Sequence, residues 1–337
     1  MKILITGGAG FVGCNWGARL MNDGHDVTVF DNLSRKGTPQ NLEWLKTQGE
    51  VNFVHGDVRD AAALTSAAKG HNAIYHLAAQ VAVTTSVINP REDFEINALG
   101  TFNMLEAARL SGMNPVIVYA STNKVYGGME DIEVVEDKTR WRYKDLPMGL
   151  PETYPLDFHS PYGCSKGAGD QYVRDHARMY DLPTVVFRQS CIYGTRQFGV
   201  EDQGFLAHFV IATAKKRVIN IYGDGKQVRD MLWIDDLLAA YNIALTNPEK
   251  VAGKIYNIGG GPLFTLSIWE DVKPLLEELS GRKIETKYGE WRPGDQKVYV
   301  SDIRKAHDEL NWQPQVPPHE GLKRLWEWVR GNLNLFE

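Results

Sequence analysis

Three glycines near the start of the chain constrain its fold more than any other feature. Gly7, Gly10 and Gly13 follow the short apolar run 2–6 and precede a helical pattern that extends from residue 14 to residue 23. Positions without a side chain allow backbone N–H groups and the amino end of a helix to approach a pyrophosphate. The order of strand, glycine turn and helix therefore predicts a dinucleotide-binding βα unit at the start of a parallel sheet.

A second apolar run, residues 26–30, ends at Asp31, so that a carboxylate follows the glycine turn by about 20 residues. An acid at this position can hydrogen-bond both hydroxyls of the adenosine ribose, which favours NAD. Arg35 lies nearby and could accept the 2′-phosphate of NADP, but Asp31 would repel that phosphate. The sequence therefore predicts NAD as the cofactor.

Strands and helices continue to alternate beyond Asp31. Small residues end the apolar run 73–79, which would let a cofactor lie close to the sheet. Such alternation is typical of a parallel, doubly wound α/β sheet. Apolar runs predict strands at 51–57, 73–79, 116–120 and 183–188, and helical patterns cover 90–111 and 165–180.

The pattern changes after Arg188, where glycine, aromatic and charged residues dominate as far as Val228, before an apolar helix from 235 to 245. A cleft between two domains would hold the substrate. We expect an NAD-binding domain at 1–190, rejoined by 230–247, and a smaller α/β substrate-binding domain at 191–229 and 248–337.

Tyr162 and Lys166 lie four residues apart and would share one face if this stretch opens a helix. A free tyrosine titrates near pH ~10, so it is a poor base at neutrality unless a fixed positive charge, such as Lys166, favours its ionised form. An isolated pair of this kind is more typical of a helix surface. However, Ser121 and Thr122 end the buried run 116–120 and would bring hydroxyls to the carboxyl edge of the same sheet. We expect proton transfer there.

The composition is typical of a soluble cytoplasmic enzyme. Of the 337 residues, 43% are hydrophobic, which supports a sizeable core. No apolar segment approaches the ~18 residues of a membrane helix, and the N-terminus runs directly into a strand without a signal-peptide pattern. The net charge of −5, from 37 basic and 42 acidic residues without a long basic run, argues against nucleic acid as the main partner. The 3 cysteines lack metal-ligand spacing, so no metal site is expected.

Three positions have both a functional and a plain interpretation. Asp57 follows the third strand and could meet the adenine amino group, with Val58 against the ring, or it is a solvated acid at a strand end. Arg229 and Arg292 lie in predicted loops and could clamp a diphosphate bidentately. A surface arginine is the alternative for either residue alone.

The chain resembles, over nearly its whole length, the extended short-chain dehydrogenase/reductase family, particularly its nucleotide-sugar epimerases and dehydratases. The glycine loop, Asp31, Ser121-Thr122 and Tyr162-x-x-x-Lys166 carry this resemblance. It implies a Rossmann fold, an NAD that stays bound and is regenerated in each turnover, and a homo-oligomer, either dimer or tetramer. Longer strings are similar to the CDP-sugar 2-epimerases of this family, which invert C2 of CDP-paratose or CDP-tyvelose, at residues 30–37, 121–127, 156–166 and 223–230.

The resemblance also implies roles for residues at matching positions. Thr122, Tyr162 and Lys166 would be catalytic, and the last two would also contact NAD. Further NAD contacts would come from Gly7, Gly10, Phe11, Val12, Gly13, Asp31, Asn32, Ser34, Arg35, Asp57, Val58, Leu77, Ala78, Ala79, Gln80, Asn97, Ser121 and Ile192. The CDP-sugar substrate would be held by Thr122, Gln189, Gln197, Gln203, Arg229, Arg292 and Asp295.

Asn123 and Lys124 distinguish this chain from related subfamilies. Sugar 4,6-dehydratases typically carry an Asp-Glu pair directly after the threonine for the elimination of water, and UDP-sugar decarboxylases usually carry a glutamate close by. The chain has neither acid there, and epimerisation needs none because it reuses one base and one cofactor. A UDP-hexose 4-epimerase is the alternative within the class. A catalytically silent NAD-binding sensor or scaffold is the alternative from another class, although all three catalytic residues are present.

Overall fold

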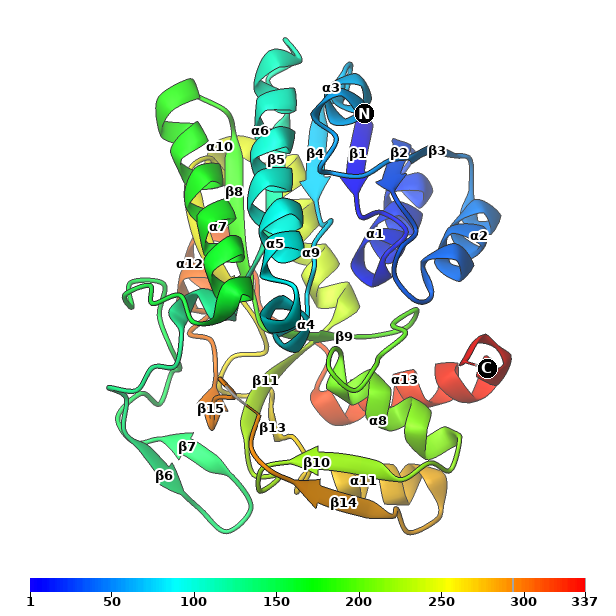
Figure 1. Ribbon diagram of the computed structural model, residues 1–337, viewed down its shortest axis with the longest axis vertical. Coiled ribbons are helices and arrows are strands. Elements are labelled where there is room, and N and C mark those ends of the chain that lie inside the picture. Colours follow the sequence, from blue (N-terminus) through cyan, green and yellow to red (C-terminus); the bar gives the residue numbers. More distant parts are fainter. Residues whose placement is uncertain (293, 337) are drawn as a thin grey trace. The chain divides into compact units, whose positions relative to one another are not determined.

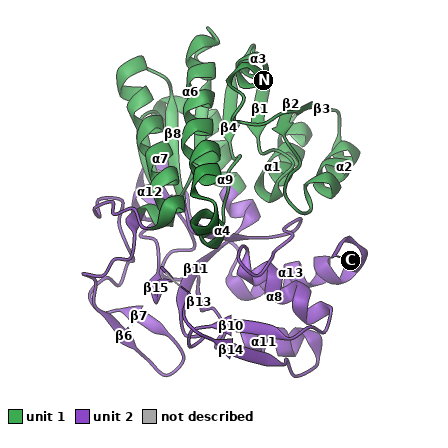
Figure 2. Cartoon of the chain, in the orientation of Figure 1, with its two compact units in different colours: residues 1–125, 160–188, 238–256 green, residues 126–159, 189–237, 257–337 purple. Residues whose placement is uncertain are grey.

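The computed structural model describes residues 1–292 and 294–336, which group into two compact units (Figures 1 and 2). Unit 1 comprises residues 1–125, 160–188 and 238–256, and unit 2 comprises the described residues of 126–159, 189–237 and 257–337. Residues 126–159, 189–190 and 230–237 were predicted in the first domain and 248–256 in the second, so the unit boundaries differ from the prediction at these four segments. Each unit combines segments that are far apart in the chain.

The main sheet has seven strands in the order β12-β8-β5-β4-β1-β2-β3. β1 pairs in parallel with β2 on one side and with β4 on the other, so the strand order reverses at β1. The parallel pairs β2–β3 and β4–β5 extend the sheet in both directions, which confirms the predicted doubly wound architecture. The strands are β1 (Lys2–Thr6), β2 (Asp26–Asp31), β3 (Val51–His55), β4 (Ala73–His76), β5 (Val116–Thr122), β8 (Thr184–Gln189) and β12 (Lys254–Ile258).

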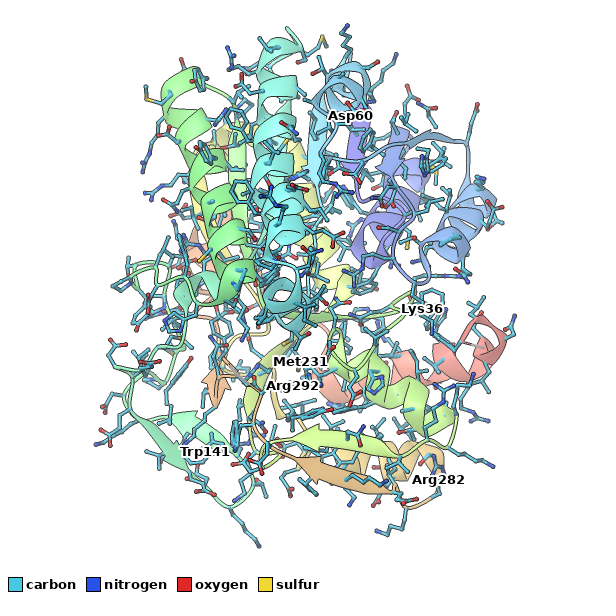
Figure 3. The ribbon with its side chains drawn as sticks, in the orientation of Figure 1. Lys36, Asp60, Trp141, Met231, Arg282 and Arg292 are labelled. Carbon is cyan, nitrogen blue, oxygen red and sulfur yellow. The ribbon has the colours of Figure 1, made fainter. Side chains whose placement is uncertain are left out.

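Local sequence explains where several helices of unit 1 begin. Asp60 caps α3, since its carboxylate accepts the N–H groups of Ala62 and Ala63 at 3.0 Å each (Figure 3). Pro39 and Pro90 occupy the first turns of α2 and α5, where a missing N–H costs nothing. The helices are α1 (Phe11–Asn22), α2 (Thr38–Gln48), α3 (Ala61–Ala68), α4 (Val83–Ile88), α5 (Pro90–Phe94), α6 (Gly100–Leu110), α7 (Ser160–Tyr180), α9 (Ile234–Thr246) and α10 (Pro248–Val251).

Two helices depart from the predicted boundaries. The helix expected at 90–111 contains a π-helical segment, η1 (Glu95–Leu99), between α5 and α6. Helix α7 begins five residues earlier than the predicted 165, at Ser160, whose Oγ accepts the N–H of Gly163 at 3.2 Å. This cap places Tyr162 and Lys166 in the first turns of α7.

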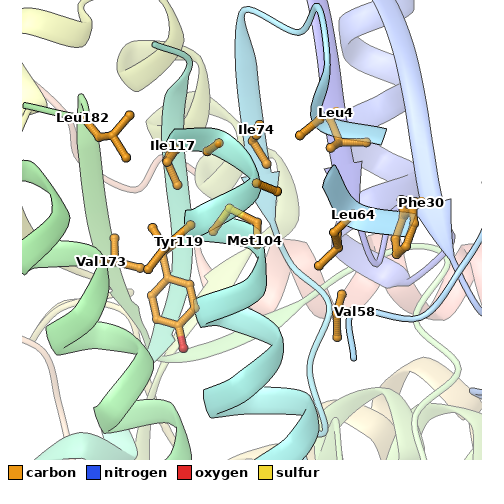
Figure 4. Close-up of a cluster of buried hydrophobic side chains, with 14 of the residues drawn as sticks. Leu4, Phe30, Val58, Leu64, Ile74, Met104, Ile117, Tyr119, Val173 and Leu182 are labelled. Atoms are coloured by element: carbon orange, nitrogen blue, oxygen red, sulfur yellow. The ribbon is translucent and has the colours of Figure 1, made fainter. Parts of the chain in front are cut away.

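The sheet is covered by apolar side chains on both faces, because successive residues of a strand point to opposite sides. On one face, Leu4, Ile74 and Ile117 pack with residues of α3, α6 and α7 (Figure 4). On the other face, Trp16, Tyr75 and Tyr241 form an aromatic cluster with ring centroids 5.1–5.8 Å apart. The hydroxyl of Tyr75 is satisfied by the carbonyl of Tyr241 at 2.8 Å.

A buried ion pair fixes α7 to the sheet. Asp170 of α7 and Arg188 of β8 are 0% and 2% exposed, and two guanidinium nitrogens contact both carboxylate oxygens at 2.9 and 3.0 Å. Ser121 of β5 donates a further hydrogen bond to Asp170 at 2.7 Å. One carboxylate therefore joins α7 to two neighbouring strands.

Unit 2 contains shorter strands and four α-helices within its described residues. In one sheet, β11 pairs with β13, β15 and β9, and in another β10 pairs with β14. Arg229 belongs to β11 and not to a loop, so the prediction for its setting was wrong: Val228 before it and the apolar run 231–233 after Asp230 continue the strand. The elements are β6 (Val134–Glu136), β7 (Trp141–Tyr143), β9 (Cys191–Tyr193), α8 (Phe205–Ala214), β10 (Ile219–Tyr222), β11 (Val228–Trp233), β13 (Thr265–Ser267), α11 (Val272–Ser280), β14 (Thr286–Gly289), β15 (Val298–Tyr299), α12 (Arg304–Leu310) and α13 (Pro318–Gly331). Short 3-10 turns occupy Asn123–Tyr126 and Leu333–Phe336.

No helix in the part of the chain that the structure describes has both the length and the apolarity needed to cross a bilayer.

Candidate active site

The turn between β1 and α1 tolerates no side chain at two of its glycines. Gly7 has a φ of +68°, and a Cβ on it would lie 2.6 Å from the backbone nitrogen of Ala78. A Cβ on Gly13 would lie 2.5 Å from the carbonyl oxygen of Gly7. Gly10 is the N-cap of α1 and has no side chain that could occupy the N–H groups of the first turn. Phe11 and Val12 open this helix, so the turn has the form of a pyrophosphate cradle.

Asp31 ends β2 directly beside this turn. Its carboxylate accepts the N–H of Ala9 at 3.0 Å and the N–H of Leu33 at 2.8 Å. Burial raises the pKa of Asp31, and the two backbone hydrogen bonds oppose this shift. The carboxylate is thus held in a fixed orientation at the end of the strand that follows the glycine turn. This geometry fits the adenosine ribose of a dinucleotide.

Asp57 lies in the loop after β3 and is bound by its neighbours. Asn32 donates to its Oδ2 at 2.8 Å, and Arg59 forms a two-pronged contact with its carboxylate at 2.8 and 2.9 Å. The bonds from Arg59 hold the pKa of Asp57 well below its usual range. The side chain of Val58 is 5% exposed and packs in the core against Gly100, where an added Cβ would lie 2.6 Å from a Val58 methyl. Ser34 and Arg35, by contrast, are exposed.

The loop after β4 is tied to the π segment η1. Gln80 and Asn97 exchange two hydrogen bonds, from the backbone N–H of Gln80 to Asn97 Oδ1 and from Asn97 Nδ2 to the carbonyl of Gln80, each 3.0 Å long. The backbone N–H of Ala78 points to the hydroxyl of Thr6 at 3.4 Å. The segment between β4 and this pair of hydrogen bonds thus consists of Leu77, Ala78 and Ala79.

Thr122, Tyr162 and Lys166 come together at the carboxyl end of β5. The hydroxyl of Thr122 donates to Asn123 Oδ1 at 3.3 Å and lies close enough to the phenol of Tyr162 to lower its pKa. Lys166 donates from Nζ to the carbonyl of Ala120 at 2.7 Å, and this nitrogen lies 4.2 Å from the centre of the Tyr119 ring. All three predicted catalytic side chains are buried, at 8%, 8% and 3% exposure. A reacting hydroxyl placed here would meet a phenol, a threonine hydroxyl and a lysine.

Burial changes the pKa values of both titratable members of this group. It raises the pKa of Tyr162 to about 12, assisted by the negative charge of Asp93 and opposed by the Thr122 hydrogen bond and the positive charge of Arg35. It lowers the pKa of Lys166 to about 7, opposed by the charges of Asp170 and Asp93. Desolvation thus favours the neutral forms of both side chains, and fixed charges around them decide how far each can ionise.

Sequence reasoning missed several polar residues around these three. Asp170 follows Lys166 by four residues on α7, so helical spacing alone could have indicated it. Asp93 and Ser165 are buried beside Tyr162 and Lys166, but no local pattern marks Asp93 in the five-residue helix α5. Ser86 of α4 accepts the backbone N–H of Tyr162 at 3.1 Å, a contact that no sequence pattern indicates.

The predicted substrate residues of unit 2 fall into separate groups. Arg229 and Asp295 form an ion pair at 2.7 Å. Arg292 lies with its guanidinium 4.0 Å from the centre of the Tyr222 ring and contacts Asp202 at 3.2 Å (Figure 3).

Two of the predicted glutamines in unit 2 have defined contacts. Gln197 is 4% exposed and donates from its amide to the carbonyl of Ile192 at 3.3 Å. Gln203 forms a β-bridge with Val200. Gln189 is the last residue of β8, at the first position of this unit's second segment.

The buried Lys166 predicts a pH dependence of stability. Because its pKa is lowered on folding, the unfolded chain binds more protons than the folded one between pH ~7 and ~10, and the free energy of unfolding should rise with pH in this window. The Lys166→Met variant lacks this contribution to the pH dependence of stability. With the cofactor removed from both proteins, the Tm of the parent should therefore rise relative to that of the variant as the pH increases from ~7 to ~10. Lys69 is exposed, so the Tm of Lys69→Met should change with pH in the same way as that of the parent. If the Tm of Lys166→Met also followed the parent over this range, the lowered pKa of Lys166 would be contradicted.

Comparisons with known proteins agree with this geometry. A model of the NAD dependent epimerase/dehydratase family matches residues 3–259. The CDP-paratose 2-epimerase of Salmonella typhi is 45% identical over 98% of this chain and 99% of its own length. The solved UDP-glucose 4-epimerase of Thermotoga maritima has a TM-score of 0.86 at 32% identity, covering 99% of this chain and 100% of that one. A dTDP-glucose 4,6-dehydratase of Streptomyces venezuelae, solved with NAD and TYD bound, has a TM-score of 0.86 at 30% identity, covering 100% and 99%.

These matches confirm the predicted family resemblance and the predicted NAD cofactor. With the glycine turn, Asp31 and the Thr122–Tyr162–Lys166 group in one unit, the chain belongs to the NAD dependent epimerase/dehydratase family.

Proposed function

We propose that the protein is an NAD-dependent epimerase that inverts C2 of a CDP-linked hexose, of the CDP-paratose/CDP-tyvelose or CDP-glucose type, through a transient 2-keto sugar. The observation that carries the chemistry is the contact between Thr122 and Tyr162, with Lys166 one turn further along α7. The choice of sugar nucleotide rests on the 45% identity to a CDP-paratose 2-epimerase. The residues after Thr122, Asn123 and Lys124, supply no acid for an elimination.

The residues of unit 1 fit NAD. The turn at Gly7 and Gly13 would receive the pyrophosphate and Asp31 the adenosine ribose, and the short loop from Leu77 to Gln80 would lie along the dinucleotide. When bound, NAD supplies the reversible oxidation of the sugar's secondary alcohol. Ser121, Asn97 and Lys166 would line the nicotinamide half, and Asp57, Val58, Asn32, Ser34 and Arg35 the adenosine half.

The side chains of the site would move one proton twice. Tyr162 would take the proton of the C2 hydroxyl as the alcohol is oxidised, and Thr122 would hydrogen-bond the same oxygen. Tyr162 must be ionised to accept this proton. Because burial favours the protonated phenol, a positive charge must stabilise the phenolate, and we propose that Lys166, one turn further along α7, supplies it. After the ketosugar has turned over in the site, Tyr162 would return the proton to the new hydroxyl.

An epimerase must hold the nucleotide while the sugar turns. In unit 2, Arg229 and Arg292 are the proposed anchors for the diphosphate, and Asp295 is a proposed contact to the nucleotide. Further proposed substrate contacts are Gln189, Gln197 and Gln203, and Ile192 is a proposed contact to NAD. Both arginines are positioned by acids of the same unit, Asp295 and Asp202. An incoming diphosphate would be recognised by the guanidinium donors that these acids leave available.

Two alternatives follow from different observations. Relatives named UDP-glucose 4-epimerase, such as that of Mycolicibacterium smegmatis at 32% identity, support oxidation of C4 of a UDP-hexose by the same side chains. A non-catalytic NAD-binding sensor or scaffold would retain the fold without turnover. The complete Thr122–Tyr162–Lys166 group speaks against this second alternative.

Incubation with separate sugar nucleotides tests the proposal. Purified protein with confirmed bound NAD should interconvert the C2 epimers of CDP-paratose or CDP-glucose, as followed by proton NMR, and leave UDP-glucose unchanged. In deuterated water the inverted carbon should acquire no deuterium, because the hydrogen returns from the cofactor. Turnover of UDP-glucose alone would identify a 4-epimerase, and no turnover of any sugar nucleotide would favour the sensor.

Replacement of Tyr162 by Phe keeps the ring and removes the ionisable group. We expect kcat to fall by a factor of ~10² to 10⁴, the usual range for the loss of a general acid-base, with NAD content unchanged. Tyr172→Phe is the matched control, since this residue lies on the same helix and is 48% exposed. Retained activity of the Tyr162 variant would exclude it as the base.

We propose that the protein is a homo-oligomer, at least a dimer, through α6 and α7. These helices expose Leu110 and Met179 at 63% and 66%, and Phe102 packs on Tyr172 with a centroid distance of 5.6 Å at 38% and 48% exposure. Apolar surface of this kind is typical of an interface. Light scattering of the parent should give a multiple of the 37.9 kDa chain mass, and the double variant Phe102→Lys/Met179→Lys should shift toward 37.9 kDa. A monomeric parent would contradict this assignment.

A further inference from the structure

A buried acid beside the catalytic group has no role in the mechanism described so far. Asp93 of α5 is 0% exposed, and its carboxylate accepts hydrogen bonds from the hydroxyl of Ser165 at 2.5 Å and from Nδ2 of Asn97 at 3.1 Å. Both partners are neutral, whereas the other buried acid near the site, Asp170, is paired with Arg188. A buried carboxylate held only by neutral donors is costly, so its presence calls for a functional explanation.

The partners of Asp93 connect it to the catalytic segment. Ser165 lies on α7 between Tyr162 and Lys166, and Asn97 also donates to its hydroxyl at 3.2 Å. Asn97 belongs to the π segment η1, and it is the residue that exchanges two hydrogen bonds with Gln80. π-helical turns inside α-helices are frequent at functional sites. Asp93 therefore lies at the centre of contacts that join α5, η1, the loop after β4 and the first turns of α7.

We propose that Asp93 is a positioning residue of the active site: through Ser165 it fixes the turn of α7 that carries Tyr162 and Lys166, and it holds a fixed negative charge near Lys166. The inference rests on the proposed roles of Tyr162 and Lys166. In this role Asp93 acts through Tyr162 and Lys166, the two side chains that are proposed to contact the substrate and the cofactor.

The electrostatics around Lys166 agree with this role. Asp93 and Asp170 are the acids that oppose the lowering of the Lys166 pKa by burial. Two further groups act near Lys166: the ring of Tyr119 from β5, which favours a cation, and His76 from β4, whose pKa is lowered to about 3 by burial and by Lys166 itself, so that it is neutral. Because Arg188 engages Asp170, Asp93 is the acid whose charge is not shared with an arginine.

The charge can be removed with little change of shape. In Asp93→Asn, the amide oxygen can still accept from Asn97 and the amide nitrogen can donate to Ser165, whose hydroxyl can turn to the carbonyl of Tyr162, 3.2 Å away. Glu92→Gln, one residue earlier on α5, is the matched control because it removes an acid that does not act on Lys166.

The test uses holoenzyme labelled with ¹³C at lysine Cε, with the Lys166 signal assigned by its loss in Lys166→Met. We expect the titration midpoint of this signal to fall by roughly one pH unit in Asp93→Asn and to stay unchanged in Glu92→Gln. The alkaline limb of the kcat profile should move to lower pH by a similar amount. An unchanged midpoint in folded Asp93→Asn protein would overturn the electrostatic part of the proposal, and this measurement stands even if no CDP-sugar is turned over.

Ser165→Ala tests the positioning part and serves if Asp93→Asn does not fold. This variant leaves the carboxylate in place and removes the hydroxyl that links it to α7. We expect kcat to fall roughly tenfold with KM unchanged, since the reacting groups lose alignment while substrate binding is retained. Ser165→Thr, which keeps the hydroxyl, should restore part of the loss. A parental kcat in Ser165→Ala would overturn the positioning role.

Discussion

The ion pair between Asp170 and Arg188 is the interaction on which the active site of unit 1 depends. One carboxylate accepts from Arg188 on β8 and from Ser121 on β5, so α7 is held against both strands at a single point. A buried pair of this kind adds little net stability, but the loss of either partner leaves an uncompensated charge. Its effect is therefore specificity of position: Lys166 and Tyr162, one and two turns earlier on α7, meet the end of β5 where Thr122 lies.

Burial then gives the site its chemistry. The same loss of solvent raises the pKa of Tyr162 and lowers that of Lys166, so both side chains are driven toward their neutral forms. A base that must take up and return one proton in each turnover needs a pKa adjustable by nearby charge. Arg35 acts on Tyr162 in one direction and Asp93 in the other. In the proposed mechanism, the balance between desolvation and a few fixed charges thus controls proton transfer.

Unit 2 meets a different requirement, since its proposed task is to recognise a nucleotide and not to change protonation. Arg229 is part of strand β11, and its ion pair with Asp295 and its bond to the carbonyl of Val228 define its orientation. Asp230, the next residue, is fully buried and accepts backbone N–H groups from Gly261 and Ser301 at 3.2 Å each. These two hydrogen bonds fix β11, the strand that carries Arg229, to the segments around Gly261 and Ser301. An arginine placed in advance loses less conformational freedom when it binds an anion.

The sequence by itself determined the doubly wound sheet, the glycine turn, Asp31 and the Tyr162–Lys166 pair, because each depends on spacing along one strand, turn or helix. It also indicated the family and NAD, which the comparisons confirmed. The tertiary structure decided what depends on distant segments: the strand setting of Arg229, the π segment at Asn97 and the buried network of Asp93. The carboxylate of Asp93 is one of several acids in a polar stretch of sequence. Only the packing of α5 against α7, more than 60 residues later, excludes water from it and makes its charge act on Lys166.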